Sequence, residues 1–211
     1  MKLPYFILEV TAMEKYADKL INQIWTTRVS RINAEKRLQQ KETFIEGINI
    51  YYSCFTVLLS IVLLVKQNYI YSLLSLAMTI ILMISILYFK SLRYAERARD
   101  YRNYYTELHR LEFRLSHVNT EEEIGEIEQK YCALLDEAEN HIPFDYYKTV
   151  AESHDPYKAA KWTSYIKHRY YWGTFWRGII KVICIILPPA LTCLAYWGQS
   201  YGWFDSIQSM G

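Results

Sequence analysis

The stretch YYSCFTVLLSIVLLVKQNYIYSLLSLAMTIILMISILYFK, residues 51–90, decides the fold because Lys66 and Lys90 are its only charged residues. A helix of about 20 apolar residues crosses the roughly 30 Å core of a bilayer. Two charge-free blocks of about this length meet here, at 48–65 and 70–89. A third block, 179–197, contains only Lys181, near its start. The sequence therefore predicts a tight transmembrane hairpin and a separate third span.

Outside these blocks the composition is that of helical, water-exposed protein. The chain has 211 residues, of which 52% are hydrophobic and 22% charged, and nearly all the charges lie between the spans. We find no strand-like alternation and no internal repeat. The predicted fold class is an all-α integral membrane protein with a two-span helical hairpin, a cytoplasmic helical domain and a third C-terminal transmembrane helix. A net charge of +2 does not by itself indicate a polyanion as partner.

The distribution of cations predicts the orientation of the spans. Residues 1–47 carry eight Lys and Arg, whereas the hairpin turn has only Lys66 and the tail after Trp197 has none. By the positive-inside rule, the N-terminus and residues 90–178 are cytoplasmic, and the turn and C-terminus are external to the inner (cell) membrane. The cations expected near the cytoplasmic headgroups are Lys36, Arg37, Lys41, Lys90, Arg93, Arg97, Arg177 and Lys181.

This orientation divides the chain into five segments. They are an N-terminal cytoplasmic helix (1–47), the transmembrane hairpin (48–89), a cytoplasmic helical domain (90–178), the third transmembrane helix (179–197) and an external tail (198–211). Aromatic residues flank the spans, and we expect Tyr51 and Tyr52 in the belt at the inner interface. Pro188 and Pro189 predict a kink or an interruption in the third span.

Local signals predict how the cytoplasmic helices begin and pair. A Thr-x-x-Glu capping box at Thr11 opens the first helix, and another at Thr120 opens a later one. Between them, a heptad seam predicts a helix that pairs antiparallel with the helix after Thr120. Residues 141–158 contain two prolines and are predicted to be a loop, followed by a helix from about Ala159. The seam consists of Tyr94, Ala98, Tyr101, Tyr105, Leu108 and Leu115.

The sequence contains no catalytic, cofactor-binding or metal-binding motif. Four cysteines lack a C-x-x-C spacing, and five histidines include no H-E-x-x-H. His154 beside Asp155 fits a general base with its orienting carboxylate, but a polar turn before Pro156 is the favoured interpretation. The arginines of 93–114 alternate with acidic residues, which is typical of a solvated helix rather than a nucleic-acid surface. We therefore expect no enzyme activity, no cofactor and no direct nucleic-acid binding.

Small polar residues follow one face of each hairpin span. They permit close helix packing within the hairpin or between protomers. They also fit the wall of a water-filled path, which two spans cannot enclose alone, so any pore requires a homo-oligomer. The sequence leaves both interpretations open. The residues concerned are Asn49, Ser53, Thr56 and Ser60 in the first span, and Ser72, Ser75 and Thr79 in the second.

The architecture and two sequence regions together resemble a known family. The first region contains Trp25, Arg28, Asn33 and Arg37, and the second is the Tyr-rich segment FKSLRYAERARDYRNYYTEL at 89–108. Over residues 11–150, the chain resembles the SLATT families, which are two-transmembrane effector domains of bacterial conflict systems. The third span departs from the minimal two-span plan of these families.

The resemblance implies an effector of antiviral defence that assembles into a pore and arrests or kills the infected cell. It also implies a neighbouring sensor or nucleotide-processing protein, such as a second-messenger synthase or a reverse transcriptase, as partner. The alternative is a membrane anchor whose helices recruit a soluble enzyme. An enzyme acting at the inner face would require chemistry from residues such as His154.

Overall fold

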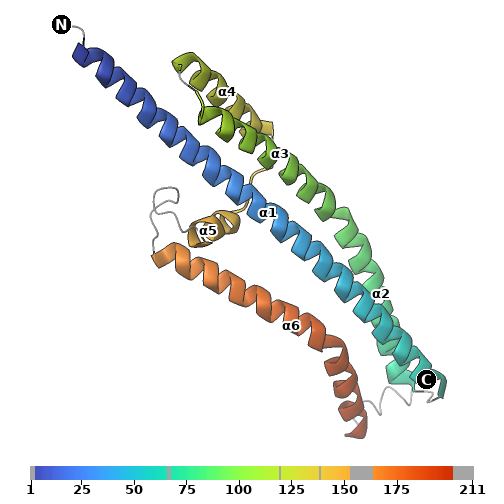
Figure 1. Cartoon of the computed structure of the whole chain (residues 1–211). Coiled ribbons are helices and arrows are strands. Elements are labelled where there is room, and N and C mark those ends of the chain that lie inside the picture. The colour runs from blue at the N-terminus through green and yellow to red at the C-terminus, as the bar shows by residue number, and fades with distance from the viewer. Residues whose placement is uncertain (1–2, 66–67, 119, 138, 153–163, 202–211) are drawn as a thin grey trace. The chain divides into compact units, whose positions relative to one another are not determined.

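In the computed structural model of the chain, the structure describes residues 3–65, 68–118, 120–137, 139–152 and 164–201. All regular secondary structure in these ranges is helical (Figure 1). The fold class predicted from the sequence is therefore confirmed as all-α. The helices are α1 (Leu3–Val65), α2 (Tyr69–Ser91), α3 (Tyr94–Leu115), α4 (Glu121–Glu137), α5 (Pro143–Glu152) and α6 (Ser164–Ser200).

Among the residues that the structure describes, three helical stretches are long and apolar enough to cross a membrane. They lie within Met13–Val65, Tyr69–Leu115 and Ser164–Gly198. In the most apolar window of the first and third stretches, only 6% of the residues are buried inside the protein. A soluble protein does not expose so much contiguous apolar surface to water. The chain is therefore an all-α membrane protein.

The chain divides into two compact units. Unit 1 comprises the described residues of Met1–Gln39 and Ala95–Gly173, and unit 2 those of Gln40–Tyr94 and Thr174–Gly211. Helices α1 and α6 each contribute residues to both units. Each unit has its own packing and is described separately below.

The core of unit 1 is formed by three helices. Leu20 and Ile24 of α1 pack with Leu108 of α3 and with Ile127 of α4, which is fully buried. The antiparallel pairing predicted for α3 and α4 is present, and α1 is its third member (Figure 1). The remaining buried members of the cluster are Leu111, Leu115, Ile124 and Tyr131.

Of the two predicted capping boxes, the one at Thr120 is present. The Glu123 amide donates to Thr120 Oγ1 at 3.4 Å, and Thr120 Oγ1 donates to the Glu123 carboxylate at 2.9 Å. The prediction that Thr11 opens the first helix was wrong, because α1 already begins at Leu3. The apolar residues before Thr11 already belong to the helix. The Thr-x-x-Glu match at Thr11 therefore lies inside the helix and does not mark its start.

Residues 143–152 form helix α5, so the predicted loop was wrong here. Pro143 occupies the first helical position, where its missing N–H breaks no hydrogen bond. The Asp145 carboxylate accepts from the Ile142 amide at 3.3 Å and favours the positive end of the helix. His154, Asp155 and the helix start predicted near Ala159 lie outside the described residues.

In unit 2, α1 and α2 form the predicted hairpin. The Asn68 side chain caps α2 by accepting from the amides of Ile70 and Tyr71 at 3.0 and 3.3 Å. Arg93, just after α2, has a φ of 49°, in the left-handed region that non-glycine residues rarely adopt. Helix α6 remains helical through Pro188 and Pro189 and bends toward its end (Figure 1).

Candidate functional site

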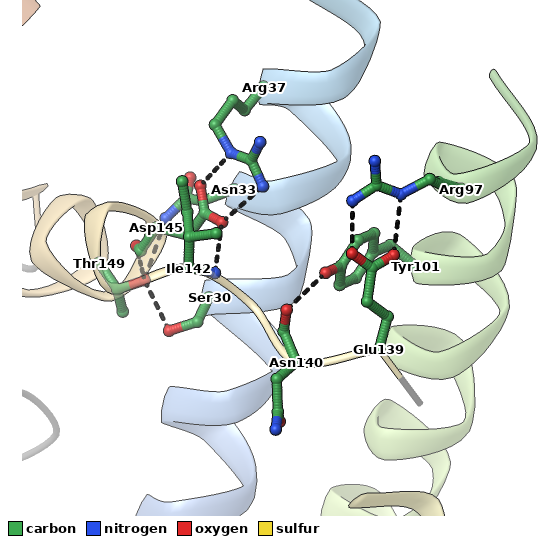
Figure 2. Close-up of polar contacts among 10 residues, drawn as sticks. All are labelled: Ser30, Asn33, Arg37, Arg97, Tyr101, Glu139, Asn140, Ile142, Asp145 and Thr149. Carbon is green, nitrogen blue, oxygen red and sulfur yellow. Dashed lines mark hydrogen bonds and ion pairs between the residues drawn. The ribbon is translucent and has the colours of Figure 1, made fainter. Parts of the chain in front are cut away.

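The most buried ion pair in unit 1 joins α1 to α5. Arg37 donates from Nε and Nη2 to the two carboxylate oxygens of Asp145, at 2.8 and 3.0 Å (Figure 2). The side chains of Arg37 and Asp145 are 11% and 1% exposed. A two-point guanidinium–carboxylate contact fixes orientation as well as distance. It therefore sets the position of α5 on α1.

Two side chains of α1, Ser30 and Asn33, and one of α5, Thr149, extend this contact along the same face of α1. Asn33 Nδ2 donates to Thr149 Oγ1 at 3.0 Å, and the hydroxyls of Ser30 and Thr149 are 3.1 Å apart. Thr149 Oγ1 in turn donates to the Asp145 carbonyl at 3.0 Å. All three side chains are buried and point toward one another (Figure 2). Each has a partner, so the docking of α5 leaves these polar groups satisfied.

The connection between α4 and α5 is held against α3. Arg97 donates from Nε to Glu139 at 2.9 Å and makes a second contact to the same carboxylate (Figure 2). The Tyr101 hydroxyl donates to the Asn140 carbonyl at 3.0 Å. Burial and the neighbouring Glu139 raise the pKa of Tyr101 to about 12. Its phenol therefore remains protonated, as a donor, at physiological pH.

Arg31 differs from these arginines because it is almost fully buried, at 1% exposure, without an acidic partner among the described residues. Its Nη2 donates to the Leu134 carbonyl at 3.4 Å, and the guanidinium lies over the ring of Tyr104. Burial lowers the pKa of Arg31. Burial is also the main cause that lowers the pKa of nearby His141, with Arg31 acting in the same direction. Both effects favour the neutral imidazole over the charged one in the folded state.

In unit 2, the small polar residues predicted along one face of α1 and one face of α2 meet where Ser60 contacts Ser75. Thr56 and Ser75 are buried, each 8% exposed, and the hydroxyls of Ser60 and Ser75 are 3.4 Å apart. Asn49 and Ser53 are half-buried, while Ser72 and Thr79 are exposed. Ser53, Thr56 and Ser60 each donate to a carbonyl of their own helix at 2.8 to 3.0 Å. The contact at Ser60 is thus one of helix packing in the single chain.

Two tyrosines of α1 bind the backbone of α6 at its double proline. Tyr52 donates to the Cys184 carbonyl at 2.7 Å, and Tyr51 donates to the Ile185 carbonyl at 3.1 Å. These carbonyls lie four residues before Pro188 and Pro189, whose missing N–H groups cannot complete the helical hydrogen bonds. From the sequence alone, both tyrosines are predicted only in an interfacial belt. A pair of prolines opposite a pair of tyrosines was the signal that could have suggested the contact.

The cations assigned to headgroups from the sequence have varied surroundings. Arg37 and Arg97 have carboxylate partners within unit 1, so the structure gives them a role in docking. Lys41 lies over the Tyr94 ring and Lys181 over the Phe44 ring, at 5.7 and 5.3 Å from the ring centres. Lys36, Lys90 and Arg93 are exposed, and Arg177 is half-buried.

Within the described residues, no three His, Cys, Asp or Glu side chains gather where they could hold a metal ion. All four cysteines are free thiols. The polar groups found in unit 1 are paired for structure rather than arranged as a nucleophile with its base. Asp145, their centre, was missed because its partner is 108 residues away in the sequence.

Comparison with known proteins adds one match. The model of SMODS and SLOG-associating 2TM effector domain family 5 matches residues 13–194. The match includes the three apolar helical stretches almost entirely, together with the α1–α5 contact. Neither the curated proteins nor the solved structures give a match.

Proposed function

The chain belongs to SMODS and SLOG-associating 2TM effector domain family 5, and on that premise we propose that it is a pore-forming effector of bacterial antiphage defence. In this proposal, the protein oligomerises in the inner membrane and depolarises or permeabilises it. A partner protein or a nucleotide signal triggers the assembly. What the family supports directly is the coarser role of a membrane effector associated with conflict systems.

The observation that carries the proposal is that the hydroxyl groups along one face of α1, which we call the α1 line (Ser53, Thr56 and Ser60), are hydrogen-bonded within their own helix. Ser53, Thr56 and Ser60 donate within their own helix, so they do not depend on α2 for a partner. If these hydroxyls were hydrogen-bonded to α2 instead, separating the two spans would leave polar groups unsatisfied in an apolar phase. That would cost free energy and oppose the separation. The α1–α2 contact can therefore rearrange at low cost. After rearrangement, the same hydroxyl oxygens are available to water in a shared path.

The contact between α1 and α6 supports a closed resting state. Tyr51 and Tyr52 hold α6 against the same helix that carries the line. Assembly then requires a trigger that binds the open form more tightly than the closed one. We place the trigger on the cytoplasmic side, where the positive-inside rule puts residues 1–47 and 90–178, with the C-terminus external.

The test measures membrane potential in bacteria with an inducible copy of the gene, with and without phage challenge. The variant Ser53→Ala/Thr56→Val/Ser60→Ala removes the three hydroxyls but nearly keeps side-chain shape. A matched control, Val57→Leu/Ile61→Leu, changes two exposed apolar positions of the same helix. We expect depolarisation by the wild type and the control at equal expression, and none by the hydroxyl-free variant. Full depolarisation by that variant would exclude the line as the pore wall.

A second candidate function is a membrane anchor that recruits a soluble partner. The 3.4 Å contact between the hydroxyls of Ser60 on α1 and Ser75 on α2 favours it, since polar residues at such a contact serve helix packing. Replacing residues 48–89 by an unrelated two-span anchor distinguishes the candidates. Protection against phage that survives this replacement supports the anchor, and its loss supports the pore.

A further inference from the structure

Four arginines on α1 and α3 pair with carboxylates among the described residues, and two of them, Arg97 and Arg102, have side chains that are 36% and 58% exposed. Arg31, at 1% exposure, is buried and has no acidic partner among the described residues. Within the described residues, carboxylates thus pair with arginines around Arg31 but not with Arg31 itself. The pairs are Arg28–Glu112, Arg37–Asp145, Arg97–Glu139 and Arg102–Glu35.

The unused donors of Arg31 are buried as well. Its Nε and Nη1 atoms have no hydrogen-bond partner, and the one bond that it makes, from Nη2 to the Leu134 carbonyl, is long at 3.4 Å. A buried charge without a counter-ion, and buried N–H groups without acceptors, both cost stability. The stacking of the guanidinium on Tyr104, at 5.4 Å from the ring centre, offsets only part of this cost.

We propose that Arg31 binds a phosphate group of a small molecule inside unit 1. Nε carries one N–H and Nη1 carries two, so three donors are available in different directions. Either Nε or Nη1, together with the second N–H of Nη2, forms a two-point fork that fits two oxygens of a phosphate. The proposal does not depend on pore formation, because it concerns binding in unit 1 alone.

Tyr104 gives the anion a route to the guanidinium. Its ring covers Arg31 but is itself half-exposed, and its hydroxyl makes only a 3.5 Å contact with the Glu137 carbonyl. Rotation of a partly exposed side chain is fast and needs no unfolding. Opening of this ring therefore connects the buried donors with solvent.

The test uses the full-length chain in detergent, with sodium phosphate as the probe against sodium chloride at equal ionic strength. We expect phosphate to raise the melting temperature of the wild type in a saturable manner. In Arg31→Met the apparent affinity falls at least about tenfold, as expected for loss of hydrogen bonds to a charged group. Arg110→Met removes an arginine that is 68% exposed and should keep the wild-type response.

A second expectation separates a binding residue from a structural one. Without phosphate, Arg31→Met should melt at or above the wild-type temperature, because it removes an uncompensated buried charge. If the variant does not fold, Arg31→Lys keeps the charge but loses the planar fork, and its phosphate response should be about tenfold weaker. Absence of a saturable shift in the wild type, or an equal shift in either Arg31 variant, overturns the proposal. Bilayer discs with and without phosphatidic acid distinguish a lipid headgroup from a soluble phosphate as the source.

Discussion

The hydroxyl of Tyr52 donates a 2.7 Å hydrogen bond to the carbonyl of Cys184, the group that Pro188 leaves without its helical donor. Tyr51 does the same for Ile185, which lies four residues before Pro189. In an apolar phase, a carbonyl released by a proline has to find another donor. The two tyrosines thus compensate for the two prolines, although they are more than 130 residues apart in the sequence.

We predict that Tyr52→Phe destabilises the protein by about 0.6 kcal/mol, the average for hydrogen bonds between membrane helices, and by no more than about 1.7 kcal/mol. The ring remains, so the loss reports the hydroxyl alone. In a Pro188→Ala background, the restored N–H supplies the Cys184 carbonyl, and the cost of Tyr52→Phe should shrink. Thermal unfolding in detergent of the four chains of this cycle measures the coupling.

Tyr69→Phe is the control. It removes the same hydroxyl oxygen from a tyrosine that is exposed on α2. It should leave the melting temperature unchanged. Equal costs of Tyr52→Phe with and without Pro188 would show that the hydroxyl and the proline are independent.

Asp145→Ala is predicted to destabilise unit 1 by about 3–5 kcal/mol, because it leaves the Arg37 guanidinium buried and unpaired. Adding Arg37→Met should recover part of this loss by removing the orphaned charge. Chemical denaturation followed by far-UV circular dichroism provides the comparison. Asp136→Ala removes the same charge from an exposed position and should cost little. A double variant no more stable than Asp145→Ala would contradict the assignment of this pair.

The pH dependence of stability should contain a contribution from His141. Burial, the largest cause, and Arg31 lower its pKa below the ordinary 6.5, while Asp145 opposes them. The unfolded chain therefore takes up a proton at a higher pH than the folded chain. The stability contributed by His141 is complete above pH 6.5 and is lost as the pH falls toward the lowered folded value.

Melting temperatures between about pH 7.5 and 5.5 test this contribution. The wild type should lose more stability on acidification than His141→Gln, whose amide does not titrate. Parallel curves for the two proteins would show that His141 is solvated in the folded state.

The sequence predicted those parts of the fold that depend on local pattern. The apolar blocks gave the hairpin and the third span, and the Thr120 capping box gave the start of α4. The heptad seam of α3 was nearly right. Its spacing places Glu112 between Leu108 and Leu115, but in the structure the neighbouring Leu111 is the core residue and Glu112 pairs with Arg28. An undistorted helix has 3.6 rather than 3.5 residues per turn, so its buried face drifts from a heptad frame.

The parts that the sequence did not predict depend on distant partners. Helix α5 is short and begins with proline, and its position is set by the Arg37–Asp145 contact, which no local pattern encodes. The same holds for Tyr51 and Tyr52, whose acceptors lie on α6. The burial of Arg31 was also not predicted, because nothing in the local sequence distinguishes it from the paired Arg28 and Arg37 on the same helix.

Two glycines of α6 provide a matched pair of substitutions. A methyl group at Gly178 would meet no atom within 4 Å, so Gly178→Ala should stabilise the helix by up to about 1 kcal/mol. At Gly173, the same group would lie 3.0 Å from Cε2 of Phe144, whose ring is tilted against that of Tyr170 with the ring centres 5.5 Å apart. Gly173→Ala gains the same helix propensity but must displace that ring, so its melting temperature should lie below that of Gly178→Ala. Adding Phe144→Leu should narrow the gap, because a smaller side chain leaves room for the methyl group. Equal melting temperatures of the two single variants would mean that α5 does not contact α6 through Phe144.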